Sequence, residues 1–313
     1  MLDELKTFMA VVEAKNFTKA AEKVNLSQPS VSVHIKNLEA YFGTQLITRC
    51  TKQKKLLITD SGKLLYRRSK ELISLLEMTE EELKSLSNSP KGHLRIGASL
   101  TIGECLLPHF LGEFCAKYPD IEIEVIIGNT TEITSMVKAF KVDLAFIEGN
   151  IHSDRLLQHY VLEDPLVLIA PKSSALPKHI VDFSLLQNQR WITSEYGSGL
   201  REALDYFLTS HHIVPRSKMV FNSNLALLQA VKNNLGIALI STHVLLTQNI
   251  SESNLKVIVL GGNVHSTFSY VLPKEVRPSK PTCIFLDEFK PYMEKIYAKI
   301  DSIYSQKSTY IIK

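Results

Sequence analysis

The chain has 313 residues with 36 Lys/Arg and 32 Asp/Glu, and 45% of its residues are hydrophobic, which predicts a globular protein of two or three domains. No stretch reaches the roughly 18 apolar residues of a membrane span, and the start MLDELKTFMA is no signal peptide, so we expect no membrane contact. Four scattered cysteines fit no metal spacing and are typical of a cytoplasmic protein.

The positive charge is concentrated near the N-terminus. Residues 1–70 contain 13 Lys/Arg and 6 Asp/Glu, a net charge of +7, whereas the remainder of the chain carries −3. A basic module on a slightly acidic body is typical of a nucleic-acid-binding protein. A basic surface without a partner is the alternative reading of the same composition.

Apolar residues at helical spacing predict a first helix over residues 2–14. A second helix is expected over 18–24, with Thr18 as its cap. After a short turn, Ser27 is expected to cap a third helix, which ends at Gly43. Two helices joined by such a turn form a helix-turn-helix.

The stretch SQPSVSVHIKNLE (27–39) has a narrow apolar stripe, formed by Val31, Ile35 and Leu38. We expect this stripe to face the core of a small domain. The other face is rich in serine, asparagine and glutamine, which are weaker helix formers than lysine or glutamate. Such side chains are useful where a helix must both donate and accept hydrogen bonds.

Two short strands within residues 46–59 are expected to form a winged hairpin with a basic tip. The alternative for this segment is a solvated charged loop. A long helix is then expected over residues 61–86, with leucines on two heptad phases that favour pairing with another helix. A compact linker follows at residues 88–92.

From residue 93 onward, strands and helices alternate, which predicts a parallel α/β sheet. In such sheets, ligands bind beyond the carboxyl ends of the strands, where helices begin. The expected helices are 101–117, 131–140, 199–210 and 224–234, and the expected strands are 93–99, 121–128, 142–149, 165–171, 190–194, 218–222 and 236–241.

Several stretches together resemble the LysR-type transcriptional regulators. The first 62 residues carry "FTKAAEKVNLSQPSVSVHIKNLEAYFGTQLITR" and "ITDSG". The body adds "LRIGAS", "LLPHFLGEFCAKYPDIEIEV", "DLAFIEG" and "LQAVKNNLGIALIS". The shorter stretches GNTTEI, AFIEG and EYGSGLR look like the branch of the family that governs sulfur or inorganic carbon assimilation.

The resemblance implies an N-terminal α winged helix-turn-helix with a long linker helix, and a C-terminal α/β two-lobed domain like the periplasmic binding proteins. The implied function is sequence-specific transcriptional regulation under the control of a small, anionic effector bound between the lobes. Promoter DNA, the effector and further copies of the chain, as a dimer or a tetramer, are the implied partners. No metal or cofactor is implied.

The implied boundaries are 1–60 for the DNA-binding domain, 61–92 for the dimerising helix and hinge, and 93–313 for the effector-binding domain. The chain is expected to cross between lobes near Glu163-Asp164 and near Ser266-Thr267. Lobe one is then about 93–163 with 268–295, and lobe two is about 164–267.

On this reading, the third helix enters the major groove of DNA. Serine and glutamine can bond base edges there, and Pro29 and Val33 can pack on thymine methyl groups. Lys36 and the basic wing are better placed for phosphates. The candidate DNA-binding residues are Ser27, Gln28, Pro29, Ser30, Ser32, Val33, Lys36, Arg49, Lys52 and Lys54.

The candidate effector-binding residues follow predicted strands and start helices, where hydroxyls and free N–H groups can bind an anion. Each hydroxyl has the alternative role of a helix cap, and Arg201 can instead pair with a nearby glutamate. The candidates are Ser99, Thr101, Thr130, Thr131, Glu148, Glu195, Ser198, Arg201 and Asn222.

Two alternatives remain open at this point. An enzyme with a fused DNA-binding domain is one, but the chain has no nucleophile elbow, dinucleotide fingerprint or P-loop. A thiol redox sensor within the same family is the other. Cys105 and Cys115 lie on one predicted helix, roughly 15 Å apart, well beyond the limit of about 7 Å for a disulfide.

Overall fold

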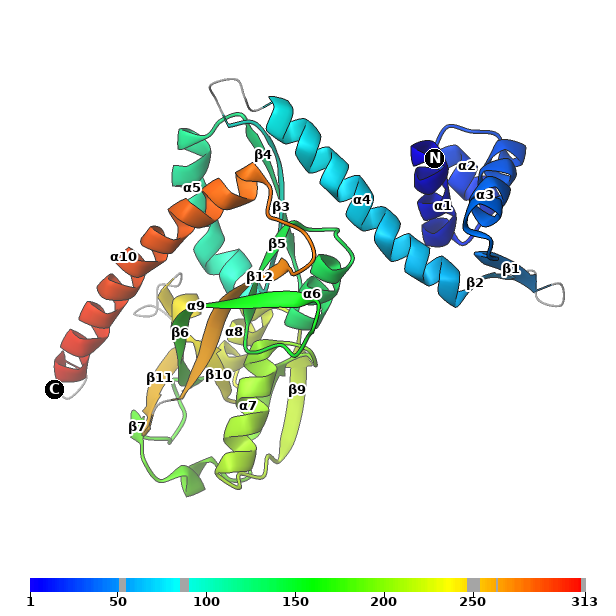
Figure 1. The fold of residues 1–313 in the computed structure, drawn as a ribbon. Helices are drawn as coiled ribbons and strands as arrows, with labels where there is room; N and C mark the ends of the chain where they lie inside the picture. Colours follow the sequence, from blue (N-terminus) through cyan, green and yellow to red (C-terminus); the bar gives the residue numbers. More distant parts are fainter. Residues whose placement is uncertain (51–54, 85–89, 247–253, 263, 311–313) are drawn as a thin grey trace. The chain divides into compact units, whose positions relative to one another are not determined.

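The computed structural model (Figure 1) describes residues 1–313 except 51–54, 85–89, 247–253, 263 and 311–313. For residues 49–50, 55, 77–78, 81–84 and 297–310 it describes the backbone alone. The chain forms two compact units, Met1–Glu80 and Glu81–Lys313. Within the described residues, no helix is both long enough and apolar enough to cross a membrane.

The N-terminal unit is a helix-turn-helix followed by a two-stranded hairpin, as the sequence predicts. Its strands are antiparallel, with Ile47 opposite Ile58. The core takes Phe8 and Val11 from the first helix and the predicted stripe from the third, where Val31 and Leu38 are fully buried. The elements are α1 (Leu2–Ala14), α2 (Phe17–Lys23), α3 (Gln28–Phe42), β1 (Ile47–Cys50), β2 (Lys55–Ile58) and α4 (Asp60–Lys84), the last of which runs into the second unit.

The predicted cap of the second helix is wrong by two residues. The N-cap of α2 is Asn16, whose extended backbone lets its side chain accept hydrogen bonds from the N–H groups of Thr18 and Lys19. Thr18 already lies inside the helix. The predicted cap of α3 is confirmed, because Ser27 accepts a hydrogen bond from the N–H of Ser30 and Pro29 lies in the first turn.

The second unit contains one sheet that runs through two lobes, with a separate pair of parallel strands. Its elements are β3 (Gly92–Ala98), the π-helical turn η1 (Ile102–Leu106), α5 (Leu107–Lys117), β4 (Ile121–Ile127), α6 (Thr130–Lys138), β5 (Leu144–Glu148), β6 (Leu156–Pro171), β7 (His179–Ile180), the 3₁₀ turn η2 (Phe183–Leu186), β8 (Arg190–Ser194), α7 (Gly199–Ser210), β9 (Ser217–Phe221), α8 (Asn224–Lys232), β10 (Ala238–Ser241), α9 (Thr242–Leu246), β11 (Leu255–Leu260), β12 (His265–Pro273) and α10 (Lys280–Tyr310).

The large sheet is mixed, not parallel throughout as the alternation predicts. Its order is β4-β3-β5-β12-β6-β11-β7, with β10 also paired to β6. Strands β4, β3 and β5 are parallel, but β12 runs antiparallel to both β5 and β6. The predicted strand 165–171 is only the second half of β6, a strand that belongs to both lobes.

The lobes are defined by separate hydrophobic cores. In the first lobe, alternate residues of β5 face opposite sides, so that Leu144 and Phe146 pack under α5 and α10 while Ala145 and Ile147 pack under α6. The second lobe has its cores around Trp191 and among α8, β10 and the second half of β6. Strand β6 changes partners, from β12 to β10, between Pro165 and Leu166. Figure 1 shows β6 and β12 as the strands that connect the lobes.

The predicted helix 101–117 is divided into two parts. Residues 102–106 form the π-helical turn η1, and α5 follows with Pro108 in its first turn. Proline suits this position because its missing N–H is not needed there. The turn carries Glu104 and the buried Cys105 toward the second lobe, where Cys105 packs in that lobe's core.

Candidate functional site

The exposed end of α3 carries most of the predicted DNA-binding side chains. Five of them are exposed: Ser27, Gln28, Pro29, Val33 and Lys36. Val33 is 52% exposed although it is apolar, so it is not part of the core. Ser30 and Ser32 are half-buried. The face that the sequence analysis assigns to DNA is therefore accessible in the N-terminal unit.

These side chains bond to one another in the absence of DNA. The Ser27 and Ser30 hydroxyls lie 2.7 Å apart, and Gln28 Nε2 donates to Ser32 Oγ at 3.2 Å. Both bonds join residues one helical turn apart.

Two other polar residues of α3 hold the domain together instead. His34 Nδ1 lies 2.9 Å from the Thr7 hydroxyl, and Asn37 donates to Glu4 at 2.8 Å. Both contacts join α3 to α1. The structure thus gives His34 a packing role.

The start of the wing is fixed by Glu39 and Thr59, which the sequence analysis missed. Glu39 Oε1 accepts from the N–H groups of Leu46 and Ile47, at 2.8 and 3.2 Å. Thr59 donates to the carbonyl of Gln45 and accepts from Gly62 N–H. A Cβ on Gly62 would lie 2.3 Å from the Leu46 carbonyl oxygen, which explains glycine there. Lys52 and Lys54, and the side chain of Arg49, lie outside the described residues.

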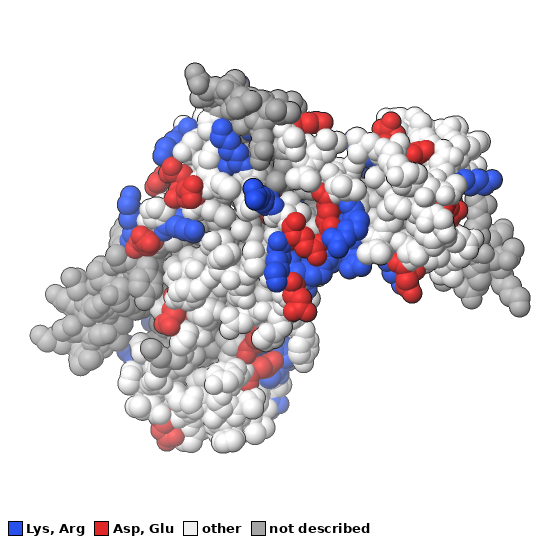
Figure 2. All heavy atoms as spheres, viewed as in Figure 1, with Lys and Arg blue, Asp and Glu red and all other residues white. Residues whose placement is uncertain are grey.

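Figure 2 shows acidic and basic side chains together on the visible face of the N-terminal unit. Several of the acidic groups are neutralised within the unit. Glu13 pairs with Lys23 at 2.6 Å and with Lys70 at 3.5 Å, and also accepts from Tyr66.

In the second unit, the predicted residues around Glu148 come together. Ser99 and Thr101 follow β3, and Glu148 ends β5; all three are at least 97% buried. Both hydroxyls face the Glu148 carboxyl and lower its pKa, but neither meets the geometry of a full hydrogen bond with any described residue. They therefore keep donor capacity for a further group.

Burial is the main reason why the pKa of Glu148 is raised to about 7. The nearby carboxyls of Asp164 and Glu104 raise it further. Burial also raises the pKa of Asp164, although His243 and Ser241 oppose this by bonding its carboxylate. Three carboxyl groups thus share a small, mostly buried region.

Residues from the second lobe complete this region, and the sequence analysis missed them. Ser241 Oγ donates to Asp164 Oδ1 at 2.7 Å, and His243 Nδ1 lies 2.9 Å from the same oxygen. Asn224 Nδ2 donates to Glu104 Oε2 at 3.3 Å. We call the connected set the interlobe polar cluster; its members are Ser99, Thr101, Glu104, Glu148, Asp164, Asn224, Ser241 and His243.

A signal for part of this set was present in the sequence. Ser241 is the last residue of a predicted strand, β10, and His243 lies two residues beyond it, at the carboxyl end where ligands bind. Asn224 lies two residues beyond the predicted Asn222, which the structure leaves exposed. Asp164 lies within a strand and has no local signal, because only the fold brings it to the point where the lobes join.

Other predicted residues are engaged in contacts between or within lobes. The Thr130 hydroxyl donates to the Glu148 carbonyl at 3.0 Å, and Thr131 N–H donates to the Gly197 carbonyl at 3.1 Å. The true N-cap of α6 is Asn129, which forms a capping box with Glu132 and donates to Glu195 at 2.8 Å. The N-x-x-E pattern was the signal for this cap.

The start of α7 differs from that of α6. Ser198 is 3% exposed and is the N-cap, but its side chain makes no capping hydrogen bond. Arg201 donates to Asp205 at 2.6 Å and to the Ser194 carbonyl, and its guanidinium lies 4.2 Å from the Tyr196 ring. Its carboxylate partner is thus an aspartate one helical turn away, and not the glutamate of the alternative role.

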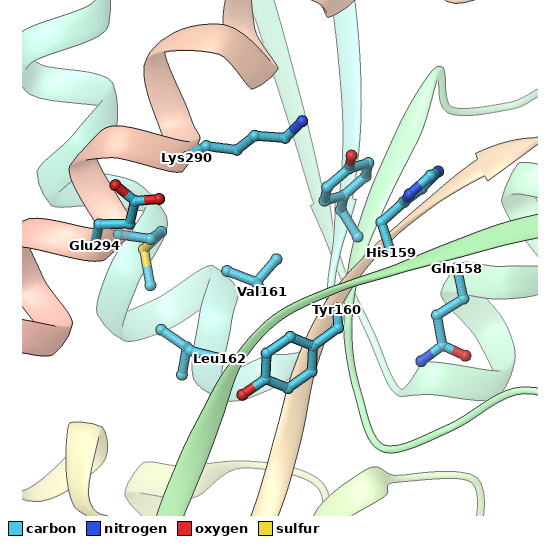
Figure 3. Close-up of a pocket in the computed structure, with 9 residues that line it drawn as sticks. Gln158, His159, Tyr160, Val161, Leu162, Lys290 and Glu294 are labelled. Carbon is cyan, nitrogen blue, oxygen red and sulfur yellow. The ribbon is translucent and has the colours of Figure 1, made fainter.

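A separate pocket of about 770 Å³ lies in the first lobe, between the first half of β6 and α10 (Figure 3). In Figure 3, Lys290 and Glu294 come from α10 and the strand supplies residues 158–162. Lys290 Nζ lies 5.5 Å from the Tyr270 ring, which stacks on His159. None of the predicted effector-binding residues lines this pocket.

The cysteines do not form a redox pair within the described residues. Cys105 is buried, while Cys115 and Cys283 are exposed, and no disulfide joins any two of these three. Cys105 packs against apolar side chains of the second lobe. Among the residues whose side chains are described, no group of three or more His, Cys, Asp or Glu is placed to hold a metal ion.

Two family models match the chain. The one described as "Bacterial regulatory helix-turn-helix protein, lysR family" matches residues 2–63, and the one described as "LysR substrate binding domain" matches residues 87–294. The chain is 42% identical to the HTH-type transcriptional regulator CysL of Bacillus subtilis over 244 residues, which cover 78% of this chain and 81% of CysL.

A second relative is the HTH-type transcriptional activator CmpR of Synechocystis sp., 32% identical over 288 residues, with 91% and 93% of the two chains covered. Among solved structures, the regulatory domain of Synechocystis CcmR in complex with 2-PG has a TM-score of 0.60 and 26% identity. It covers 66% of this chain, and 97% of that domain is matched. The relatives are named as regulators, which excludes the enzyme reading and does not favour the redox sensor.

Proposed function

Because the chain belongs to the LysR family of bacterial transcriptional regulators, we propose that it binds a promoter sequence and that a small anionic effector in the interlobe polar cluster controls this binding. The names of the relatives agree with the branch that governs sulfur or inorganic carbon assimilation. A regulator of this kind acts on chromosomal DNA, so we expect the protein in the cytoplasm.

The division of labour that we propose is 1–60 for DNA binding, 61–92 for dimerisation and the hinge, and 93–313 for effector binding. The exposed leucines of α4 support the dimerisation step. Leu64, Leu72, Leu75 and Leu76 are each between 37% and 54% exposed in the single chain. Apolar side chains on a long helix are usually covered by a partner helix.

For DNA, the exposed end of α3 is the proposed reading element. Gln28, Ser30 and Ser32 would meet base edges in the major groove, with Pro29 and Val33 against apolar groups. Lys36 and the wing lysines and arginine would hold phosphates, which position the protein without reading sequence. Ser27 keeps its role as the N-cap of α3 and would touch DNA only at the edge of the interface between α3 and the groove.

For the effector, the hydroxyls of Ser99 and Thr101 are the observation that carries the proposal. They are 99% buried without a full hydrogen bond to any described residue, and polar groups buried in this way are normally satisfied. The N-cap of α7, Ser198, makes no side-chain capping bond, and Gly199 after it lies so close to Glu148 that a Cβ there would be 2.4 Å from the Glu148 carbonyl oxygen. The first N–H groups of α7 are therefore near the cluster and suited to an anion. Binding of 2-PG by the CcmR regulatory domain supports a small ligand in this domain.

Calorimetric titration of the full-length protein with small compounds that carry an oxyanion group tests this assignment. Ser99→Ala and Thr101→Val should weaken binding by about tenfold or more, because each removes a buried donor to a charged group. Ser153→Ala, in the loop before β6, is the control and should bind as the parent does. Equal affinities in all four proteins would remove the site from the cluster.

A further inference from the structure

The interlobe polar cluster contains two buried acceptor atoms for which the described part of the chain supplies no donor. Asp164 is fully buried, and its Oδ2 has no hydrogen-bond partner in the described part of the chain. His243 Nε2 is likewise buried and unpartnered there. When His243 donates from Nδ1 to Asp164, the other ring nitrogen is an acceptor.

Glu148 adds a buried carboxyl group. The residue is 97% buried, and its carboxyl has no ion-pair partner in the part of the chain that the structure describes. Its neighbours are two hydroxyls, which can donate or accept, and the carboxyls of Asp164 and Glu104. Arg201, in the first turn of α7, is bonded to Asp205 and to a backbone carbonyl.

This arrangement is unfavourable for an effector that carries only negative charge. A bare oxyanion beside Glu148 and Asp164 would meet like charges in a region with little water to screen them. A metal ion is not the natural complement either, since the described residues offer no cluster of three ligands. The unpartnered acceptors of Asp164 and His243 instead call for a ligand group that donates several hydrogen bonds.

We propose that the effector is a zwitterion, with an ammonium group facing Glu148 and Asp164 and an oxyanion facing the Ser198 end of α7. This rests on the proposed function and names its ligand class. An ammonium has three donors and a positive charge, which match the two carboxyls and the free imidazole nitrogen. The hydroxyls of Ser99 and Thr101 can bond either group, because a hydroxyl can accept from the ammonium or donate to the oxyanion.

Glu148 is then the residue that selects for the amine. It ends β5 in the first lobe, while Asp164 lies on β6 and is bonded by His243 and Ser241 of the second lobe. An ammonium bound to both carboxyls would join the two lobes at the strand that connects them. This gives the effector a higher affinity for one lobe arrangement, which is what control of DNA binding requires.

The test compares ligands that differ only in the amine. The pairs are taurine with ethanesulfonate and phosphoethanolamine with ethyl phosphate, titrated calorimetrically into the full-length protein at pH 8. Three proteins are compared: the parent, Glu148→Gln, and Glu163→Gln as the matched control. Glu163 is the residue before Asp164, but its side chain is 49% exposed and pairs weakly with His265 at 3.9 Å.

In the parent, at least one amine-bearing ligand should bind about tenfold or more tightly than its amine-free partner. Glu148→Gln should reduce that ratio to near one, while Glu163→Gln should preserve it. Equal or tighter binding of the amine-free ligands by the parent would overturn the zwitterion and leave the anion site standing. If neither member of either pair binds to any protein, both this inference and the proposed effector site fail.

Discussion

Among single residues, Glu148 gives the clearest dependence on pH. Its pKa is about 7 in the folded chain and near 4.5 when exposed, so the folded state holds the proton over that interval. A folded state that binds more protons loses stability as the pH rises. The free energy of unfolding should therefore fall, relative to Glu148→Gln, by on the order of 3 kcal/mol between about pH 4.5 and pH 8.

Denaturant unfolding of both proteins across this pH range measures the difference. The difference should become constant above about pH 8, where Glu148 is ionised in both states. Parallel stability curves for the parent and Glu148→Gln would mean that the carboxyl titrates normally, and the account of its burial would be wrong.

Glu39 is a second residue whose effect can be stated. It bonds the N–H groups of Leu46 and Ile47, so Glu39→Ala leaves two donors at the base of the wing without their partner. We expect a loss of about 1–3 kcal/mol in the stability of the N-terminal unit. Thermal unfolding followed by circular dichroism measures this, with Glu22→Ala, an exposed glutamate on α2, as the control. A loss no larger than that of the control would show that these bonds contribute little.

At the scale of elements, α3 was well predicted because all of its signals are local. The serine cap, the proline in the first turn, the stripe of Val31, Ile35 and Leu38, and the terminal Gly43 each act within one helix. The parallel strands β3, β4 and β5 are also predictable from local patterns. Strand β5 is a fully buried apolar run, whereas β4, at the edge of the sheet, alternates apolar residues with Glu122 and Glu124.

Elements shaped by distant partners were not predictable in this way. The first half of β6 is held by pairing with β12, more than 100 residues away in the sequence, and it contains polar residues such as Gln158 and His159. Dependence on distant partners also explains which residues of the site were predictable. Ser99, Thr101 and Glu148 follow predicted strands, whereas Asp164 has its role only because β6 passes between the lobes.

The α3 surface predicts how variants will bind DNA. Gln28→Ala and Ser32→Ala should reduce discrimination between operator and random duplex by about 1–3 kcal/mol where a base contact is lost. Lys36→Ala should weaken binding to all sequences alike. It should also reduce the slope of log affinity against log salt concentration by about one, the contribution of one phosphate contact. Fluorescence anisotropy over a salt series separates the two effects, and unchanged binding by all three variants would contradict the proposed docking of α3.

For the whole molecule, the leucines of α4 predict the state of assembly. Replacing Leu72 and Leu76 together with glutamate places charges on the exposed apolar face and should reduce the size of the oligomer. Light scattering measures the mass. Leu185→Glu, at an exposed leucine of η2, is the matched control and should keep the parent's mass. An unchanged mass in the double variant would place the main interface outside α4.

The central claim is that an effector in the interlobe polar cluster controls DNA binding, and one measurement tests it directly. A duplex selected from a random library by the full-length protein is titrated with and without a small ligand that calorimetry has shown to bind. We predict that the ligand changes the affinity or the footprint on this duplex, and that Ser99→Ala and Thr101→Val lose the change while they still bind the duplex. A ligand effect of equal size in the parent and in both variants would contradict the account.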